Sequence, residues 1–319
     1  MSSKISGPER ALRNSDIDYL IGMLSCKEYV RTMRFNPFPW QDAVLGSRRK
    51  RKIILAARQS GKSTIVSTRP CHKAKYKERS LSVVLAATEK QAVEDMEKIK
   101  GFIQSDTTFP QIVRSSDSLI KLENDSRIVV VPATEKAARG YSKPDFVLLD
   151  EASRIDDIVY TSGIKPMFTD NPDGELDLLS TPAGKMGFFF EIWDHGPATW
   201  EKYMIRSPWQ PKETDSGLSL VQYMQEAAFV AGCREKGIHY ACFSPRHMRF
   251  EEQLENLMEM GSLMYRQEYC CEFVETVDTV FSYDEIRRLE ESLAAPMVQR
   301  VIGGDAMPAD LDFSMFERF

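Results

Sequence analysis

The sequence predicts an α/β protein built on a mostly parallel, doubly wound sheet that helices flank, with a small helical subdomain after the sheet. Two patterns predict this fold class. Several short segments are apolar along their whole length, which is typical of strands buried on both faces, and they alternate with segments of helical spacing. The expected strands are Ile53–Ala57, 81–88, the apolar part of DFVLLDEAS, 175–180 and WEKYMIRSP.

The expected helices lie before, between and after these strands. They are a lead-in over 17–33, a short helix ending at Gly46, a helix over 62–77, TEKQAVEDMEKIKGFI opened by Thr88, and 217–231, 248–259 and 284–294. One antiparallel feature interrupts the alternation, because LIKLENDSRIVVVPA predicts a hairpin around Asn124–Ser126.

Composition sets outer limits on the function. The 319 residues carry a formal net charge of −5, so any nucleic-acid contact has to come from local basic clusters. Six cysteines and four histidines at irregular spacing fit a reduced intracellular protein better than a disulfide scaffold. No segment has the length and apolarity of a signal peptide or a membrane span, so we expect no membrane partner.

The segment ILAARQSGKSTIV, at 53–65, has the form of a phosphate-binding loop between a strand and a helix. Backbone N–H groups at a helix start and the Lys62 ammonium suit β and γ phosphates, and the Ser63 hydroxyl suits Mg²⁺. Ala56 stands where a glycine is usual, but it is small enough for a similar turn if its φ stays negative. Taken alone, a GKS triplet is also compatible with an ordinary helix start.

A second motif supports the phosphate-binding interpretation. FVLLDE places Asp150 at the end of a buried strand, where it can hold the water shell of Mg²⁺, and Glu151 beside it, where it can polarise an attacking water. The alternative is a solvated turn with incidental acids. Together the two motifs predict a P-loop NTPase of the ASCE type, the class that carries a glutamate beside the metal-binding aspartate, with ATP and Mg²⁺ as cofactors.

Five segments together resemble the ATPase domain of the large terminase subunit of tailed bacteriophages. They are NPFPWQDAVL, ILAARQSGKST, ATEKAARGYSKPDFVLLDEAS, LLSTPAGKMGFFFEIW and YRQEYCCEF, and they occur in the family's order over about 35–285. The resemblance implies an ATP-hydrolysing motor that translocates double-stranded DNA into a procapsid. It also implies a homo-oligomeric ring on a portal protein, a small terminase subunit as partner, and a place in the host-cell cytoplasm rather than in the mature virion.

The resemblance assigns roles to individual residues. Arg58 becomes a candidate finger acting in cis, where a guanidinium could neutralise charge at the γ phosphate, although it could also be a structural strut. Ser180 and Thr181 resemble the coupling motif and could contact Glu151 or its water, although plain turn capping is the alternative. Glu151 and Arg58 are the expected catalytic residues, and Ser63 and Asp150 the metal ligands. The expected nucleotide-binding residues are Gln41, Ala56, Ala57, Gln59, Ser60, Gly61, Lys62, Ser63 and Thr64.

Three further features have open interpretations. Gln41 could read the adenine edge while Phe38 or Trp40 packs on the base, or it could be a helix-start glutamine beside core aromatics. Arg139 could reach a neighbouring subunit's nucleotide or DNA, or bond loop carbonyls. The run RRKRK, at 48–52, could touch DNA phosphates, but a solvated edge is the expected role. Possible zinc ligands at Cys233, His239, Cys242, Cys270 and Cys271 lack a CxxC knuckle, which disfavours zinc.

These features divide the chain into four expected parts. A helical lead-in covers 1–34, the ATPase core 35–215, and a helical subdomain or linker 216–296. The last part, 297–319, resembles the opening of an RNase H-like nuclease domain, with Asp305 at the place of a first metal-binding acid. The remaining strands and acids of such a domain have no room, so we expect either a truncated or split product or an ATPase segment taken without its nuclease, and no nuclease activity from this chain alone.

Two alternative functions stay open. A superfamily 2 helicase or translocase shares the glutamine motif, the phosphate loop and the acidic strand, but it needs a second RecA-like domain. A non-hydrolysing terminase remnant that binds DNA or portal as an assembly module is the other. The intact Lys62, Ser63, Asp150 and Glu151 argue against the remnant.

Overall fold

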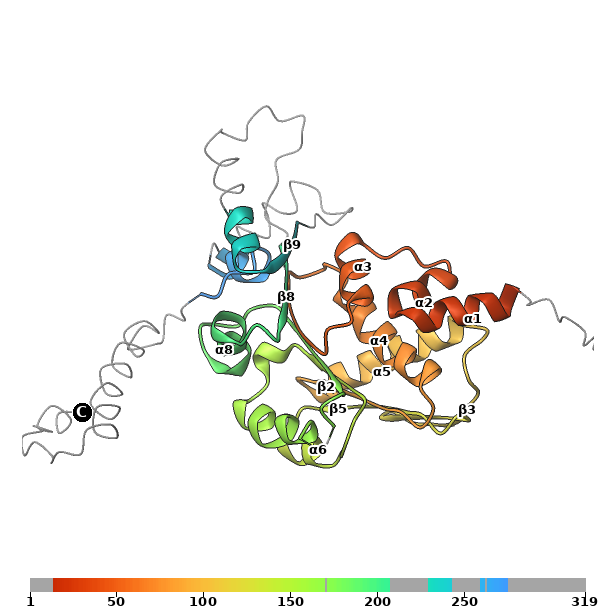
Figure 1. The fold of residues 1–319 in the computed structure, drawn as a ribbon. Coiled ribbons are helices and arrows are strands. Elements are labelled where there is room, and N and C mark those ends of the chain that lie inside the picture. The colour runs from red at the N-terminus through yellow and green to blue at the C-terminus, as the bar shows by residue number, and fades with distance from the viewer. Residues whose placement is uncertain (1–13, 170, 207–228, 243–258, 262, 275–319) are drawn as a thin grey trace, which may run out of the picture. The chain divides into compact units, whose positions relative to one another are not determined.

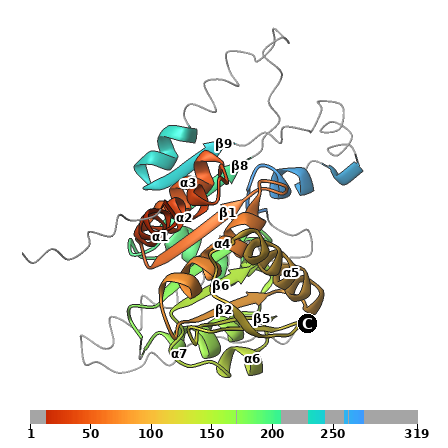
Figure 2. The same ribbon diagram turned by 90° about the vertical axis from the view of Figure 1, so that its right-hand side faces the viewer.

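The centre of the molecule is a twisted sheet in which parallel strands predominate. The computed structural model describes residues 14–169, 171–206, 229–242, 259–261 and 263–274. Within them the strand order is β3-β4-β5-β2-β6-β7-β1-β8-β9 (Figure 2). The strands are β1 Arg51–Ala56, β2 Leu81–Ala86, β3 Ile112–Ser115, β4 Leu119–Leu122, β5 Arg127–Pro132, β6 Phe146–Asp150, β7 Glu175–Ser180, β8 Glu201–Arg206 and β9 Ile238–Cys242. Only the β3–β4 and β4–β5 pairs of these described strands are antiparallel.

Helices cover both faces of the sheet (Figure 1). They are α1 Asn14–Leu24, α2 Cys26–Thr32, α3 Pro39–Gly46, α4 Lys62–Tyr76, α5 Glu89–Ser105, α6 Glu135–Arg139, α7 Lys165–Met167 and α8 Gly187–His195, with short helices at Ala152–Arg154 and Val159–Ile164. Alternate residues of each central strand serve opposite faces: Ile54 joins the core under α2–α5, and Ile53 joins the core under α8 and the short helices. This division explains why the strands are apolar throughout.

The predicted strands and the hairpin are confirmed, with shifts of a few residues. The strand before the phosphate loop begins earlier than expected, at Arg51. The lead-in helix is divided into α1 and α2, because Ser25 caps α2 by accepting a hydrogen bond from the Glu28 N–H. Thr88 caps α5 as predicted, accepting from the Gln91 N–H.

The subdomain expected over 216–296 is not purely helical. Ile238–Cys242 forms β9, which extends the sheet in parallel with β8. Periodicity missed this strand because IHYAC is short and mixes polar with apolar residues. The predicted helices at 217–231 and 248–259 fall largely, and that at 284–294 entirely, outside the described residues, as does the segment with Asp305. The described residues all belong to one compact unit that ends at Val274, and the other domain boundaries remain predictions.

A buried network of charges joins α4 to the strands below it. Arg69 pairs through Nε with Asp177 Oδ2 at 2.9 Å, and through a terminal nitrogen with Glu175 Oε2 at 2.7 Å. Lys73 reaches Glu175 as well, and Lys52 Nζ lies 3.5 Å from Asp177 Oδ1. Burial acts to raise the pKa of Glu175, but the charges of Arg69 and Lys73 outweigh it and hold this pKa at about 2.

The network corrects the interpretation of the basic run at 48–52. Lys52, its last member, is fully buried with Asp177, and Arg51 donates to the Gly174 carbonyl while its guanidinium lies over the Phe168 ring. A solvated edge describes only the start of the run, where Lys50 pairs with the exposed Asp173. The sequence does not reveal this because the partners lie more than a hundred residues away.

We expect Arg69→Met to lower the free energy of unfolding by about 3–5 kcal/mol, because it leaves the buried carboxylates of Asp177 and Glu175 without their main partner. Lys50→Met is the matched control. It removes an exposed pair and should cost no more than about 1 kcal/mol. Urea unfolding measures both, and an Arg69→Met protein as stable as the control would contradict a stabilising role of the network.

Candidate functional site

The phosphate loop runs from the end of β1 to the start of α4. Its turn is made by Gln59 and Gly61, which have φ angles of +56° and +90°. A glycine is required at position 61 for two reasons. Residues other than glycine rarely adopt this positive φ, and a Cβ there would lie 2.7 Å from Gln41 Nε2. Ala56 is the last residue of β1 and lies outside the turn, so an alanine at the usual glycine position causes no strain.

Two residues of α3 support the loop. Trp40 Nε1 donates to the Ser60 carbonyl at 3.2 Å, and Gln41 Nε2 donates to the Gly61 carbonyl at 2.9 Å. Gln41 Oε1 accepts from the Phe38 N–H at 2.8 Å. Gln41 is almost wholly buried, and both ends of its carboxamide are occupied. In this structure the Gln41 carboxamide supports the loop, which fits the helix-start alternative, and its role in reading an adenine edge stays a prediction.

The loop and the acidic strand meet at one ion pair. Lys62 Nζ lies 2.7 Å from Glu151 Oε1, and Ser180 and Thr181 donate to Glu151 Oε2 at 3.3 and 3.4 Å. The contact predicted between the Ser180–Thr181 hydroxyls and Glu151 is therefore present. Glu151 has a left-handed backbone, with φ 51°, which turns its side chain back toward the loop. Burial acts to raise the pKa of Glu151, but the Lys62 charge outweighs it, so the carboxylate stays ionised.

Asp150 is more deeply buried and has no cation of its own among the described residues. Its Oδ2 accepts from Gln91 Nε2 at 2.5 Å, and its Oδ1 has no hydrogen-bond partner in the same part of the chain. Burial, followed by the charges of Asp95 and Glu151, raises the pKa of Asp150 to about 7. An unpartnered buried carboxylate oxygen beside the pocket that Ser63 lines is compatible with a divalent cation, whose preferred ligands are oxygens.

Arg58 is held by a residue far along the chain. Its backbone N–H donates to the Glu268 carbonyl at 2.9 Å, and its Nε lies 3.2 Å from Glu268 Oε2. Arg154 approaches the same side chain, 3.2 Å from Glu268 Oε1, and lies 3.7 Å from Glu151 Oε2. Glu268 is buried while more than half of the Arg58 side chain is exposed, so the guanidinium stays close to solvent.

These groups line one pocket of about 480 Å³ at the carboxyl ends of the strands, where ligands of open α/β sheets bind. Four of the predicted site residues besides Asp150 and Glu151 reach it: Arg58, Lys62, Ser63 and Thr181. Thr64 and Ser60 are used inside the loop and helix, since the Thr64 N–H donates to the Gly61 carbonyl and Ser60 Oγ donates to the Ala57 carbonyl.

Arg139 and the cysteines lie apart from this pocket's lining. Arg139 pairs with Glu135 on its own helix at 2.5 Å and remains largely exposed. Cys233 and Cys271 are buried, and the described residues contain no group of three or more His, Cys, Asp or Glu able to hold a metal. None of the described helices is long and apolar enough to cross a membrane.

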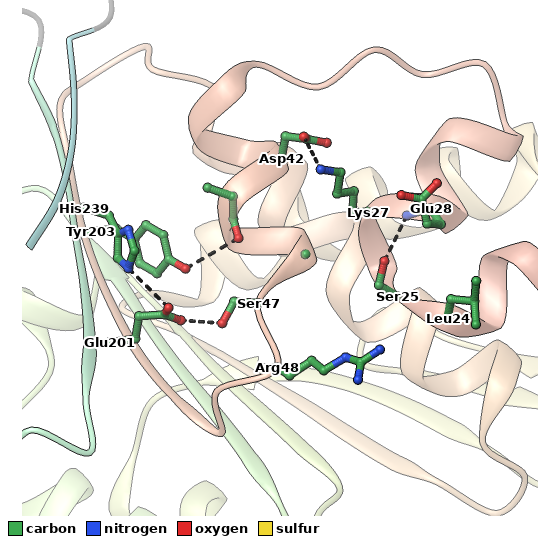
Figure 3. Close-up of a pocket in the computed structure, with 12 residues that line it drawn as sticks. Leu24, Ser25, Lys27, Glu28, Asp42, Ser47, Arg48, Glu201, Tyr203 and His239 are labelled. Atoms are coloured by element: carbon green, nitrogen blue, oxygen red, sulfur yellow. Dashed lines mark hydrogen bonds and ion pairs between the residues drawn. The ribbon is translucent and has the colours of Figure 1, made fainter.

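A second pocket, of about 510 Å³, lies at the opposite ends of β1 and β8 (Figure 3). Its polar groups satisfy each other: Ser47 donates to Glu201, whose other oxygen lies 3.3 Å from His239 Nε2, and Lys27 pairs with Asp42 at 2.7 Å. Such mutual pairing leaves little for a ligand to gain, and the first pocket is the better candidate for chemistry.

The contributors to the site that were not predicted include Gln91, Asp95, Arg154 and Glu268. Two of them had a usable signal, since Gln91 and Asp95 are four residues apart on a helix that directly follows a buried strand, and Asp95 occupies its apolar face. Glu268 lies in YRQEYCCEF, but nothing in the local pattern identifies Arg58 as its partner.

We expect Asp150→Asn to stabilise the nucleotide-free protein at pH 8 more than at pH 5. In the unfolded chain the pKa is near 4, so the raised folded-state pKa favours folding at low pH, and this contribution is lost as the pH rises through about 7. An asparagine does not ionise, so the variant does not lose this stability as the pH rises. Thermal unfolding in EDTA should show a Tm gain at pH 8 exceeding that at pH 5 by about 2 °C or more. Exposed Asp173→Asn is the control, and equal gains at both pH values would contradict the expectation.

Comparisons with known proteins identify the family and the fold. Two curated relatives are each described as terminase, large subunit: that of Thermus phage G20c is 28% identical over 276 residues, and that of Thermus virus P23-45 is 27% identical over 276 residues. The matches cover 80% of this chain and 52% of each relative, so the chain spans about half the length of these relatives. The large terminase ATPase domain of Thermus phage P74-26 shares the fold, with a TM-score of 0.54, 19% identity, and coverage of 82% of this chain and 98% of that chain.

The family model described as terminase large subunit, T4likevirus-type, N-terminal matches residues 53–288. The match begins in β1, includes the phosphate loop and the acidic strand, and extends beyond the segment that holds Arg58. Because it covers well over half of the sequence, the chain belongs to this terminase large-subunit family.

Proposed function

We propose that this chain is the ATP-hydrolysing motor part of a phage terminase that moves double-stranded DNA into a procapsid. The observation that carries the proposal is the ion pair between Lys62 and Glu151, with Asp150 behind it in the same pocket. The pair brings together the groups that phosphoryl transfer needs at one edge of the sheet. Family membership favours the terminase motor over a superfamily 2 helicase.

The proposed hydrolysis begins with an exchange of partners. The phosphates of ATP bind the backbone N–H groups at the start of α4 and draw Lys62 toward them. Glu151 then loses its cation and becomes available to orient a water and accept its proton. Ser63 and Asp150 would hold Mg²⁺, which when bound neutralises charge on the β and γ phosphates.

Arg58 is the proposed finger in cis. Its guanidinium lines the pocket and is mostly exposed, so it can leave Glu268 for the γ phosphate without crossing the protein interior. Ser180 and Thr181 would couple the two events, because their hydroxyls contact Glu151 and they lie at the end of β7. A change in the position of the Glu151 side chain would therefore alter the contacts at the end of β7, a central strand of the sheet.

The partners belong to the proposal as well: a portal protein, a small terminase subunit, and further copies of this chain in a ring, in the host-cell cytoplasm. Arg139 remains a candidate for reaching a neighbouring copy or DNA, since its partner Glu135 lies on an exposed helix face. Packaging motors act on assembled rings, so a single copy is expected to turn over slowly.

A row of cations marks a proposed DNA contact. Arg114, Lys121 and Arg127 are register partners on β3, β4 and β5, so their side chains share one face of the sheet. Like charges directly opposite each other destabilise a sheet, and within the described chain only Lys121 of the three forms an ion pair, with Asp125 at 3.3 Å. A DNA phosphate backbone offers the missing counter-charge.

We expect Glu151→Gln to lower kcat for DNA-stimulated ATP hydrolysis in assembled protein by about 10²–10⁴, because no carboxylate accepts the proton of water. Arg58→Ala should lower kcat by about 10³ while nucleotide affinity is kept. Exposed Arg79→Ala serves as the control. Unchanged hydrolysis in Arg58→Ala would make Arg58 a strut, and absence of Glu151-dependent turnover would favour the non-hydrolysing assembly module.

The DNA contact is tested by Arg114→Ala combined with Arg127→Ala. Non-specific duplex binding, measured by fluorescence anisotropy at several salt concentrations, should weaken, and the slope of log K against log salt should fall by roughly one for each phosphate that the variant no longer binds. Arg234→Glu, an exposed site before the opposite edge strand, is the control. An unchanged slope in the double variant would place DNA elsewhere.

A further inference from the structure

One face of α5 is turned toward the aspartate at the end of β6. Gln91 and Asp95 are four residues apart and therefore lie above one another on the helix. Gln91 Nε2 donates to Asp150 Oδ2 at 2.5 Å, and the Asp95 and Asp150 carboxyl groups lie within hydrogen-bonding distance of each other. The first turns of α5 thus contact the proposed metal ligand at two points.

Each of the two carboxyl groups has one oxygen that accepts from a nitrogen and one that does not. Asp95 Oδ1 accepts from Lys98 Nζ at 2.9 Å, and Asp150 Oδ2 accepts from Gln91. Asp95 Oδ2 and Asp150 Oδ1 are buried, and once both carboxyl groups are ionised they have no donor among the described residues. Buried polar atoms are nearly always satisfied, so two such oxygens on neighbouring acids require an explanation.

Three of the cations that line this pocket are already engaged. Lys62 pairs with Glu151, and Arg154 lies between Glu151 and Glu268. Lys98 pairs with the other oxygen of Asp95. When Asp95 and Asp150 are both ionised the local charge is negative, and the arrangement then lacks a positive charge with a preference for carboxylate oxygen.

We propose that Asp95 is the second anionic group of the cation site and that Gln91 fixes the orientation of Asp150 toward it. Asp95 is a positioning residue in this proposal, because it acts from outside the group of atoms that bind the cation directly. Ser63 and Asp150 remain the ligands. The inference rests on the proposed nucleotide site, and it adds the α5 face to it.

A purely structural role makes a different prediction. If Asp95 only anchors α5 to β6, its replacement changes folding stability and nucleotide affinity alike whether or not Mg²⁺ is present. If Asp95 belongs to the cation site, its replacement changes the part of nucleotide affinity that Mg²⁺ contributes. The ratio of the Kd in EDTA to the Kd in Mg²⁺ isolates that part.

The experiment measures the Kd of a fluorescent, non-hydrolysable ATP analogue in EDTA and in Mg²⁺ for four proteins, each with all 319 residues of this chain. They are the wild type, Asp95→Asn, Asp150→Asn and Glu94→Gln. Asp95→Asn preserves the shape of the side chain and an oxygen for Lys98. Glu94→Gln is the matched control, because it removes the same charge from the next residue, which is exposed and lines the same pocket.

We expect the Mg²⁺-dependent ratio to fall by about 10-fold in Asp95→Asn, as for losses of outer-shell groups elsewhere. The Kd in EDTA should be unchanged or tighter, since one negative charge is removed from the phosphate site. Asp150→Asn should lose the ratio and Glu94→Gln should keep it. A preserved ratio in Asp95→Asn overturns the inference.

Two outcomes separate the inference from the proposed function on which it rests. If the wild type binds nucleotide without any effect of Mg²⁺, or does not bind it, the proposed nucleotide site itself fails. If Asp95→Asn does not fold, as judged by circular dichroism, Gln91→Met tests the same face without changing a charge. A Mg²⁺ ratio in Gln91→Met equal to that of the wild type also overturns the inference.

Discussion

The ion pair between Lys62 and Glu151 is the interaction on which the site depends. Lys62 begins the helix after β1, and Glu151 follows β6, while β7 lies between these two strands and ends at Ser180, beside Thr181. The pair therefore joins two elements across a third. It keeps Glu151 ionised inside a largely buried pocket and leaves Asp150, its neighbour, with an unpartnered oxygen. The charge environment of Glu151, and with it that of Asp150, therefore changes when Lys62 exchanges its partner.

The two buried charge clusters differ in a way that separates structure from chemistry. At the amino-terminal part of β7, Asp177 and Glu175 each contact at least two cations, and the network is compensated. At the carboxyl end of β6, Asp95 accepts from one lysine, Lys98, and within the described chain the only nitrogen donor to Asp150 is the Gln91 amide. Uncompensated buried charge is costly, and proteins retain it where a ligand completes the site. The contrast supports the proposal that the carboxyl edge of the sheet holds the nucleotide and its cation.

Local patterns predicted most of the sheet, since apolar strands and helix caps such as Thr88 depend on neighbours in sequence. They also identified Lys62, Glu151 and the Ser180–Thr181 contact, because parallel strands bring their carboxyl ends to one edge. They failed where a contact depends on distant partners. Lys52 was expected at a solvated edge but is buried against Asp177, and the strand at Ile238–Cys242 exists because β8 offers it an edge.

The contact between Arg58 and Glu268 has a consequence for the order in which the molecule is made. These residues are among the most widely separated of all paired groups in the described chain, and the backbone of one donates to the backbone of the other. A chain emerging from the ribosome completes β1, the phosphate loop and β6 long before Glu268 exists. During that interval the phosphate loop can form its turn, but Arg58 lacks its contacts with Glu268. Contacts of such sequence separation form late and slowly, so the proposed nucleotide site reaches its final form only after almost the whole of the described chain has been synthesised.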